Sequence, residues 1–312
     1  MPTPRATILL PAYNEEQSVP KVVEDVRTVL YGLPFECEIL VIDDGSTDRT
    51  AALAVESGAR VVRHHRRKGA GAAVKTGILE ARGELVLLMD ADGTYPTGAI
   101  PAFFTLSGDF RHVIGARRKE AGTSPLLRAA VKTLLRKLGE FLVRQPIPDI
   151  NSGMRAFRRR DAMAFLHLFP DGHSCVSTLT LCYLAMGLPV RFEPIDYFPR
   201  IGDSKFRVVR DTLRFLVQII RTITYFAPLR VFLSASLAFL LAGVVKSGWD
   251  WHRKGGLEES DIILFTFAAV MGMMGLLADL IARQSRKQIT DELFSFPGDE
   301  GIKKRGNNQG VP

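Results

Sequence analysis

The sequence predicts an α/β domain with a mainly parallel sheet and helices on both faces, followed by an interfacial amphipathic helix and two transmembrane helices. Three observations predict this fold. Short apolar runs alternate with amphipathic segments up to about residue 116, an arginine-striped helical segment covers residues 206–226, and long apolar segments follow at 229–245 and 262–282. A chain of 312 residues is long enough for one sizeable soluble domain with an appendage.

The soluble part contains five predicted strands, each short and apolar. They cover residues 7–10, 38–42, 60–63, 84–89 and 113–116. The segments between them have helical periodicity and cover residues 18–30, 49–57, 71–81 and 98–106. This alternation of strand and helix is typical of a mainly parallel sheet, in which ligands bind at the carboxyl ends of the strands.

Three polar clusters directly follow predicted strands, so we expect them to meet at one edge of the sheet. In the cluster at residues 90–96, Asp90 and Asp92 flank Ala91 at the end of an apolar run. Two carboxylates one residue apart form a chelate for Mg²⁺ or Mn²⁺, hard cations that commonly bridge to substrate phosphates. The cluster therefore predicts a metal-dependent enzyme that uses a phosphorylated donor.

The other two clusters each have a structural alternative. Residues 14–16 either cap the following helix or bind a nucleotide base or ribose. Residues 44–48 could form only a tight turn, but the doubled carboxylates Asp43 and Asp44 favour contacts to a nucleoside.

A glycine-rich turn at residues 69–71 opens the third helical segment. It resembles a phosphate-binding turn, although the same glycines could serve only close packing. The basic residues 66–68 just before it suit a diphosphate, and a solvated basic loop is an equally good interpretation.

The basic composition narrows the possible partners. A net charge of +8 and a pI of about 9.5 suit nucleic acid, anionic lipid or a phosphorylated substrate. No RNA-binding signature accompanies this charge and only 9% of the residues are aromatic, so we expect no nucleic-acid partner. The three scattered cysteines fit neither a disulfide framework nor a zinc site.

The segment at residues 206–226 has a narrow polar face and a broad apolar face. At about 100° per residue, the polar face carries Arg207, Arg210, Asp211, Arg214, Gln218 and Arg221. Such a helix suits the bilayer interface, with its arginines toward the headgroups. Packing on the soluble core is the disfavoured alternative, because apolar membrane-type segments follow directly.

The two long apolar segments predict membrane spans joined by a short outer loop, residues 246–261, which contains both tryptophans. Basic residues are frequent in the C-terminal tail, so the positive-inside rule places the catalytic domain and the C-terminus in the cytoplasm. Asp279 should form an ion pair with Arg283 one turn further along its helix.

The expected organisation has four parts. They are a cytoplasmic catalytic domain (1–205), an interfacial helix (206–227), a transmembrane hairpin (228–283) and a partly disordered cytoplasmic tail (284–312). Gly272 and Gly275 support close helix packing, and we expect a homo-oligomer formed through the membrane region.

Six motifs carry a resemblance to a known family. Residues 10–16 (Leu-Pro-Ala-Tyr-Asn-Glu-Glu), 43–48 (Asp-Asp-Gly-Ser-Thr-Asp) and 90–96 (Asp-Ala-Asp-Gly-Thr-Tyr-Pro) resemble those of the family 2 inverting glycosyltransferases with a GT-A fold. The motifs Gly-Ala-Arg at 115–117, Asp-x-x-Ser-Gly at 149–153 and Arg-x-Gly-x-Ser-Lys at 200–205 are similar to those of polyprenyl-phosphate glycosyltransferases. That group contains the dolichol-phosphate mannose synthases and the bacterial undecaprenyl-phosphate glucosyltransferases. The resemblance covers roughly residues 5–210.

The resemblance implies an inverting transfer of a hexosyl group from a nucleotide-diphosphate sugar, UDP-glucose-like or GDP-mannose, to undecaprenyl or dolichyl phosphate. Asp90 and Asp92 would hold Mg²⁺ or Mn²⁺ on the donor diphosphate, and Asp149 would lie near the acceptor, where it could act as a base. The catalytic residues would thus be Asp92 and Asp149. The donor would be bound by Pro11, Tyr13, Asn14, Glu15, Asp43, Asp44, Lys68, Asp90 and Ala91. The lipid phosphate would be bound by Arg117, Arg128, Arg200, Ser204 and Lys205.

The chain departs from the mannose synthases after the carboxylate pair. Gly93-Thr94-Tyr95 stands where those enzymes usually carry Leu-Ser-His, which puts mannose and a guanine nucleotide in question. A processive polysaccharide synthase of the same superfamily is the alternative, but two spans are few for a translocation channel and the chain has no Gln-x-x-Arg-Trp motif. The intact carboxylate clusters argue against a non-catalytic membrane scaffold.

Overall fold

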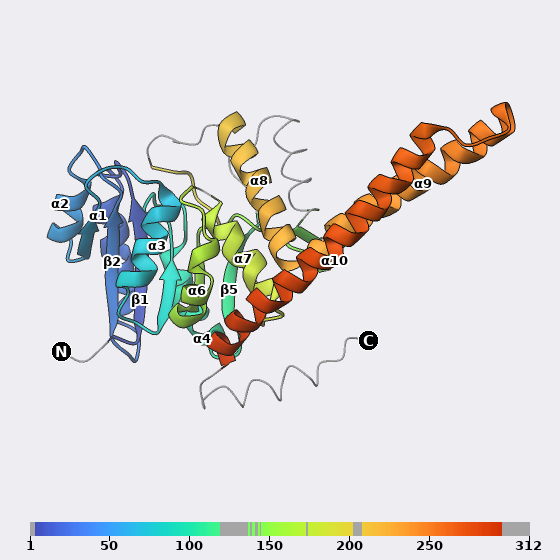
Figure 1. Ribbon diagram of the computed structural model, residues 1–312. Helices are drawn as coiled ribbons and strands as arrows, with labels where there is room; N and C mark the ends of the chain where they lie inside the picture. The colour runs from blue at the N-terminus through green and yellow to red at the C-terminus, as the bar shows by residue number, and fades with distance from the viewer. Residues whose placement is uncertain are drawn as a thin grey trace. The chain divides into compact units, whose positions relative to one another are not determined.

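The computed structural model describes residues 4–118, 137, 139–140, 143, 145–172, 174–201 and 208–294. The chain divides into two compact units, residues 1–219 with 293–312 and residues 220–292. The first unit contains the sheet and its covering helices, and the second contains most of a pair of long helices (Figure 1).

A seven-stranded sheet forms the centre of the first unit, with the strand order β3-β2-β1-β4-β6-β5-β7. Its strands are β1 (Ala6–Ala12), β2 (Cys37–Asp43), β3 (Arg60–Arg63), β4 (Leu85–Leu88), β5 (His112–Arg117), β6 (Arg155–Arg158) and β7 (Val190–Ile195). Strands β1 to β4 run parallel, as do β5 and β7, whereas β6 is antiparallel to both of its neighbours. The predicted mainly parallel sheet is confirmed, and its five predicted strands lie where expected.

The antiparallel strand β6 positions the later motifs. The sequence does not predict it, because a four-residue run with arginine at each end lacks an apolar strand pattern. Its register pairs Arg155 with Leu88 of β4. The segment that precedes β6, residues 149–154, therefore returns to the carboxyl end of β4, where the predicted metal carboxylates lie.

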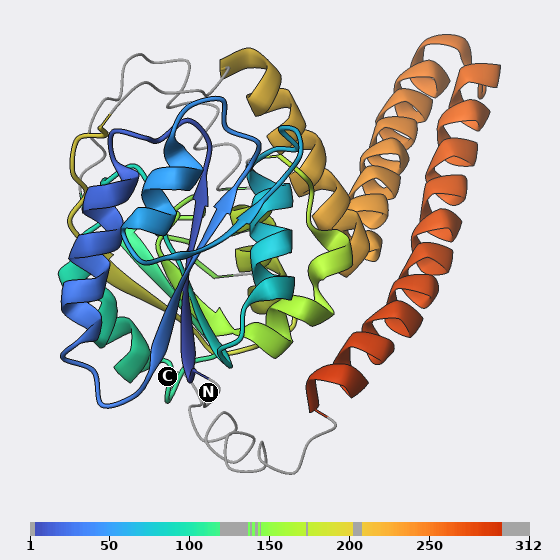
Figure 2. The same ribbon diagram turned by 90° about the vertical axis from the view of Figure 1, so that its left-hand side faces the viewer.

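Helices cover both faces of the sheet, as expected (Figures 1 and 2). One face carries α1 (Val19–Leu30), α2 (Thr50–Glu56), η1 (Thr97–Ala99) and α4 (Ile100–Leu106). The other carries α3 (Ala70–Glu80), α6 (Arg159–Ala164), η2 (Leu166–Leu168) and α7 (Cys175–Ala185). Helix α1 buries valines at 19, 22, 23 and 26, one helical face, in the apolar core beside the sheet. Each such buried side chain stabilises the fold by about 1.5–3 kcal/mol.

The second unit is mostly an antiparallel hairpin of α9 (Pro228–Lys254) and α10 (Glu259–Phe294), which lie side by side (Figure 1). Both helices are long and apolar enough to cross a membrane, and only 11% and 17% of their most apolar windows are buried. Exposed apolar surface of this extent is typical of lipid contact. Asp279 and Arg283 form the predicted ion pair, with 2.7 Å between Oδ2 and Nε.

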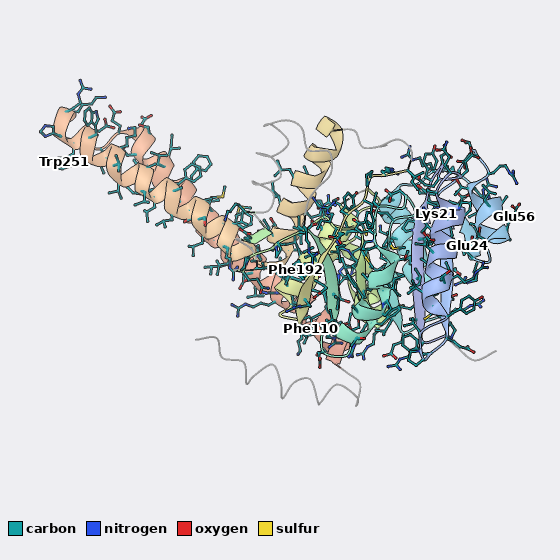
Figure 3. The ribbon with its side chains drawn as sticks, turned by 180° about the vertical axis from the view of Figure 1, so that it is seen from behind. Lys21, Glu24, Glu56, Phe110, Phe192 and Trp251 are labelled. Atoms are coloured by element: carbon teal, nitrogen blue, oxygen red, sulfur yellow. The ribbon has the colours of Figure 1, made fainter. Side chains whose placement is uncertain are left out.

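The expected outer loop over residues 246–261 is mostly helical, and the connection between the two long helices covers only residues 255–258; the side of the membrane on which it lies stays a prediction. Helix α9 includes both tryptophans, and Trp251 is labelled near its end in Figure 3. Charged residues such as Lys246 do not stop the helix, because lysine and arginine have high helix propensity. Lys246 also forms an ion pair with Asp261 of α10, 2.9 Å from Nζ to Oδ1. The helix ends instead at Gly255, whose φ of 72° is the left-handed conformation that glycine adopts without strain.

The predicted amphipathic helix is α8 (Val208–Phe226). Gln218, on the predicted polar face, is buried and donates a hydrogen bond from Nε2 to the Leu168 carbonyl at 3.1 Å. In contrast, the side chains of Val217 and Ile220 are 58% and 48% exposed. At Gln218 the helix packs on the soluble core, the alternative that the sequence disfavours, whereas Arg221 on the same polar face is exposed. The contact between the arginines and the headgroups stays a prediction.

Candidate active site

The carboxylate pair follows β4 at the carboxyl end of the sheet. Asp92 is buried, and its Oδ1 accepts hydrogen bonds from the Thr94 backbone amide at 3.1 Å and hydroxyl at 2.6 Å. Ala91 is also buried, whereas Asp90 is exposed. One carboxylate is thus fixed by the turn that follows it, and the other is accessible to a ligand.

The two carboxylates repel each other. The surrounding protein and the charge of Asp92 raise the pKa of Asp90 above its ordinary value, against the opposing effect of nearby arginines. A divalent cation would relieve this repulsion, and carboxylate oxygens are ligands that Mg²⁺ and Mn²⁺ prefer. Within the described residues no group of three or more His, Cys, Asp and Glu side chains offers a fuller ligand set. The pair therefore fits a metal whose other ligands are phosphate oxygens and water.

Gly153 lies directly against the Asp90 carboxylate. A Cβ atom at this position would come within 2.4 Å of Asp90 Oδ2 and 2.8 Å of its Cγ. Side chains do not tolerate such distances, so any larger residue at 153 would displace the carboxylate. The turn before β6 thereby forms one wall of the site.

Arg200 joins the carboxylate pair to the first polar cluster. Its guanidinium forms an ion pair and a hydrogen bond with Glu15 and lies 3.5 Å from Asp92 Oδ2. The next residue, Ile201, donates its backbone amide to the Asp92 carbonyl at 3.1 Å. Residues that are predicted to bind donor, metal and acceptor are thus in direct contact.

Asp149 and Arg117 form a two-point ion pair. Arg117 donates from Nε to Asp149 Oδ2 at 2.7 Å and from Nη2 to Oδ1 at 3.0 Å. Burial alone would raise the pKa of Asp149, but the hydrogen bonds and charge of Arg117 lower it below the ordinary value. Because Asp149 stays ionised and is fully engaged by a cation, it is a weak proton acceptor. The pair instead fixes where the arginine lies.

Asp44 organises the loop that follows β3. Its carboxylate accepts hydrogen bonds from the backbone amides of Lys68 at 2.8 Å and Gly69 at 2.7 Å, and it contacts His64 Nδ1 at 2.8 Å. These contacts give the second of the doubled carboxylates a structural role that the sequence does not reveal.

Asp43 and Asn14 join the first two polar clusters. Asp43 is fully buried, accepts the Ser46 amide at 2.9 Å and forms an ion pair with Arg63 at 3.0 Å. Asn14 has a left-handed backbone, with φ of 51°, and its Oδ1 accepts the Thr47 amide at 2.9 Å. The two strand ends are therefore tied together before any ligand binds.

The glycine-rich turn serves close packing. Cβ atoms at Gly69 and Gly71 would lie only 2.4 Å and 2.2 Å from the carbonyl oxygens of Asp171 and Pro170. The amides of Gly71 and Ala72 donate to the Asp171 carbonyl. Of the two interpretations of this turn, the structure supports packing rather than phosphate binding.

A cationic depression of about 520 Å³ lies beside this turn. Residues 66–68 line it together with Lys75 and Asp171, whose side chains form an ion pair at 2.7 Å. The Arg67 guanidinium lies over the Tyr13 ring, 4.1 Å from its centroid. The contact places Tyr13 at the rim of a basic surface that suits an anionic ligand.

Pro11 lies within β1, paired with Ile42. The structure also brings in Arg155, which the sequence does not single out; its signal is a cation inside a short strand beside the Asp-x-x-Ser-Gly motif. Arg128, Ser204, Lys205 and Arg207 lie outside the described residues.

The chain is similar to known glycosyltransferases. Residues 7–165 match the family described as Glycosyl transferase family 2, and residues 227–284 match the GtrB C-terminal hairpin. The chain is 29% identical over 303 residues to glycosyltransferase AglJ of Haloferax volcanii, covering 93% of this chain and 98% of that protein. It is 31% identical over 202 residues to a dolichyl-phosphate hexose transferase of the same organism, covering 64% of this chain and 85% of that protein.

A solved structure with a similar fold is glucosyl-3-phosphoglycerate synthase from Mycobacterium tuberculosis, in complex with Mn²⁺, uridine-diphosphate-glucose and phosphoglyceric acid. The TM-score is 0.57 at 20% identity, and the match covers 70% of this chain and 80% of that chain. The likeness confirms the predicted GT-A-like fold.

Proposed function

Because this chain belongs to glycosyl transferase family 2, we propose that it moves a hexosyl group from a nucleotide-diphosphate sugar to a polyprenyl phosphate at a membrane. The transfer would require Mg²⁺ or Mn²⁺ held by Asp90 and Asp92. One observation carries the proposal. The carboxylate pair, in which Asp90 is accessible, lies beside Arg200 at the carboxyl end of the sheet, in a chain whose residues 227–284 match the GtrB hairpin.

Both the relatives and the hairpin support a lipid-linked acceptor. One relative is named a dolichyl-phosphate hexose transferase, and this chain has two helices long and apolar enough to span a bilayer. Exposed Val217 and Ile220 on α8 suit contact with the membrane interface. We place the catalytic domain and the C-terminus on the cytoplasmic side, on the basis of the basic tail.

The donor side of the reaction depends on charge. The bond between the sugar C1 and the diphosphate oxygen breaks, and its electron pair leaves with the nucleoside diphosphate. A metal bound by Asp90 and Asp92 would supply positive charge at this leaving group. The glucosyl-3-phosphoglycerate synthase of similar fold was solved in complex with Mn²⁺ and uridine-diphosphate-glucose, which supports a metal-dependent donor site of the same kind in this chain. The cationic surface around Arg67 adds further positive charge near Tyr13.

The acceptor side depends on the two arginines near the carboxylate pair. An oxygen of the polyprenyl phosphate forms the new bond to C1 on the face opposite the leaving group, which inverts the anomeric centre. Arg117 and Arg200 bind this phosphate, and their positive charges offset the repulsion between the phosphate and the carboxylates. A phosphate monoester, with a second pKa of about 6, is already largely ionised at neutral pH, so it needs no strong base. Asp149 therefore positions Arg117 in this mechanism rather than removing a proton.

A mass measurement tests the proposal and its alternative. Purified protein in lipid nanodiscs is given undecaprenyl or dolichyl phosphate, Mn²⁺ and a panel of nucleotide sugars. We expect one polyprenyl-phosphate hexose per turnover, with no product in excess chelator. A growing polysaccharide would instead support the processive synthase, and activity that survives complete metal removal would refute the metal assignment.

Replacing Arg200 by glutamine should raise KM for polyprenyl phosphate about tenfold. It should not weaken Mn²⁺ binding, because the change removes a cation that lies 3.5 Å from Asp92. Steady-state kinetics and Mn²⁺ titration followed by electron paramagnetic resonance measure the two effects. The matched control is Arg118→Gln, which breaks an exposed 3.5 Å pair with Asp196 and should change neither value. If only the affinity for the donor falls, Arg200 binds the donor diphosphate rather than the lipid phosphate.

Replacing Gly153 by alanine should lower the transfer rate roughly tenfold to a hundredfold, since the new methyl group forces the Asp90 carboxylate aside. Gly98→Ala is the control, because a Cβ atom there meets nothing within 4 Å. Initial rates at saturating donor and Mn²⁺ compare the two variants. Equal rates for both would show that the position of Asp90 does not limit the reaction.

A further inference from the structure

The Asp90 carboxylate is held by packing rather than by hydrogen bonds. Among the described residues, no group donates a hydrogen bond to it or pairs with it, whereas Asp92 accepts two bonds from Thr94. Its closest constraint is Gly153, which leaves no room for even a methyl group. The orientation of Asp90 therefore depends on how firmly the turn at Gly153 is fixed.

Tyr95 fixes this turn from one side. Its hydroxyl accepts a hydrogen bond from the Gly153 backbone amide at 2.6 Å. The Tyr95 ring is 5% exposed and packs edge-on against Tyr197, with 5.3 Å between the ring centroids. A buried and packed ring gives the hydroxyl a fixed position.

Arg155 fixes the turn from the other side. Its guanidinium donates from Nε to the Ser152 carbonyl at 3.1 Å, and Nη2 donates to the same oxygen. Its Nη1 donates to the Val176 carbonyl and to the Thr180 hydroxyl, both on α7. Arg155 thus ties the turn to a buried helix through four hydrogen bonds.

The burial of Arg155 requires an explanation. The side chain is fully buried, and within the described residues it forms no ion pair with a carboxylate. Burial lowers its pKa to about 10, so the group still carries its charge at neutral pH. Burying a cation without an ion-pair partner opposes stability, and an apolar residue would fit a short strand better. A role in geometry accounts for its presence.

We propose that Tyr95 and Arg155 are positioning residues, which together hold the Ser152–Gly153 turn as a wall that sets the Asp90 carboxylate for metal binding. The inference rests on the proposed function, because it assumes that Asp90 is a metal ligand. Neither residue touches the substrate or the metal in this proposal. Both fix the turn, and the charge of Arg155 also favours the ionised form of Asp90.

The test compares Mn²⁺ affinity in Tyr95→Phe, Arg155→Met and the double variant, with full-length protein in nanodiscs. We expect each single change to raise the Kd for Mn²⁺ about tenfold. The Kd of the double variant for Mn²⁺ should equal the higher Kd of the two single variants, since both residues act through one turn. Arg155→Lys, which keeps a donor and the charge, should recover part of the affinity.

A control variant separates positioning from general destabilisation. Arg159→Met also removes arginine hydrogen bonds to backbone carbonyls, those of Ile78 and Leu79, but away from the site. It should lower the melting temperature without changing the Kd for Mn²⁺. If Arg155→Met does not fold, Tyr95→Phe and Arg155→Lys still decide the matter.

The outcomes distinguish this inference from the proposed function. If Tyr95→Phe and Arg155→Lys fold and bind Mn²⁺ as tightly as the wild type, the positioning roles are wrong. Fully additive losses of affinity in the double variant would also overturn them. Neither result would contradict the transfer activity proposed for the wild type. Wild-type protein that binds Mn²⁺ but forms no lipid-linked hexose would refute only the proposed acceptor. Wild-type protein that binds no Mn²⁺ would overturn both.

Discussion

Replacing Asp92 by asparagine will leave a folded protein that has lost nearly all transfer activity, a reduction of about a thousandfold. Asparagine has almost the same shape as aspartate, and its Oδ1 can still accept the two hydrogen bonds from Thr94. The turn should therefore survive, while the negative charge that holds the metal is lost.

Rates of lipid-linked product formation, together with Mn²⁺ titration, measure this effect. Asp25→Asn on the exposed face of α1 is the matched control and should behave like the wild type. Circular dichroism should show the same melting curve for wild type and Asp92→Asn. Transfer by Asp92→Asn at the wild-type rate would be incompatible with a metal site at this pair.

Replacing Asp149 by asparagine will reduce transfer about a hundredfold, because Arg117 loses the two-point pair that orients it. The free energy of unfolding should also fall by about 3 kcal/mol at neutral pH, since the change leaves a largely buried cation without its partner. The control is Asp196→Asn, which removes the exposed partner of the neighbouring Arg118 and should cost little.

The pH dependence gives an independent check on Asp149. Its pKa is lower in the folded protein than its ordinary value of 3.8, so its contribution to stability is complete above that value and is lost as the pH falls through the lower, folded pKa. The stability difference between wild type and Asp149→Asn should therefore shrink on strong acidification. A difference that grows on acidification would contradict the ion pair. A wild-type transfer rate that follows a titration near neutral pH, absent from Asp149→Asn, would restore the role of Asp149 as a base.

The sequence predicts the early part of the fold well because strong local signals coincide there. The strands from β1 to β5 are apolar runs bounded by polar clusters, and each amphipathic segment between them is helical. Strand β6 lacks this signal because it begins with Arg155, a buried cation whose guanidinium donates to the Val176 carbonyl, far away in the chain. The partners of a charged residue cannot be read from periodicity.

The sequence likewise predicts only part of the candidate site. The carboxylate pair and its place at the sheet edge follow from strand ends alone, and the structure places both there. Whether a glycine-rich turn binds phosphate or packs against another loop depends on residues a hundred positions away, here Asp171 beside Gly71. Likewise, Gln218 belongs to the polar stripe of α8 by spacing, but its partner Leu168 decides where it points.

The contact between Arg200 and Glu15 has a consequence for how the enzyme is made. These residues are 185 positions apart in the chain, and their contact joins the two ends of the catalytic sequence beside the carboxylate pair. During synthesis, Asp90 and Asp92 leave the ribosome before Arg200, the arginine that lies beside Asp92. The site can reach its finished form only after the segment around residue 200 has emerged, late in the formation of the domain. A nascent chain that stops short of Arg200 would carry both carboxylates and most of the sheet, yet lack the cation that joins them to the first strand end.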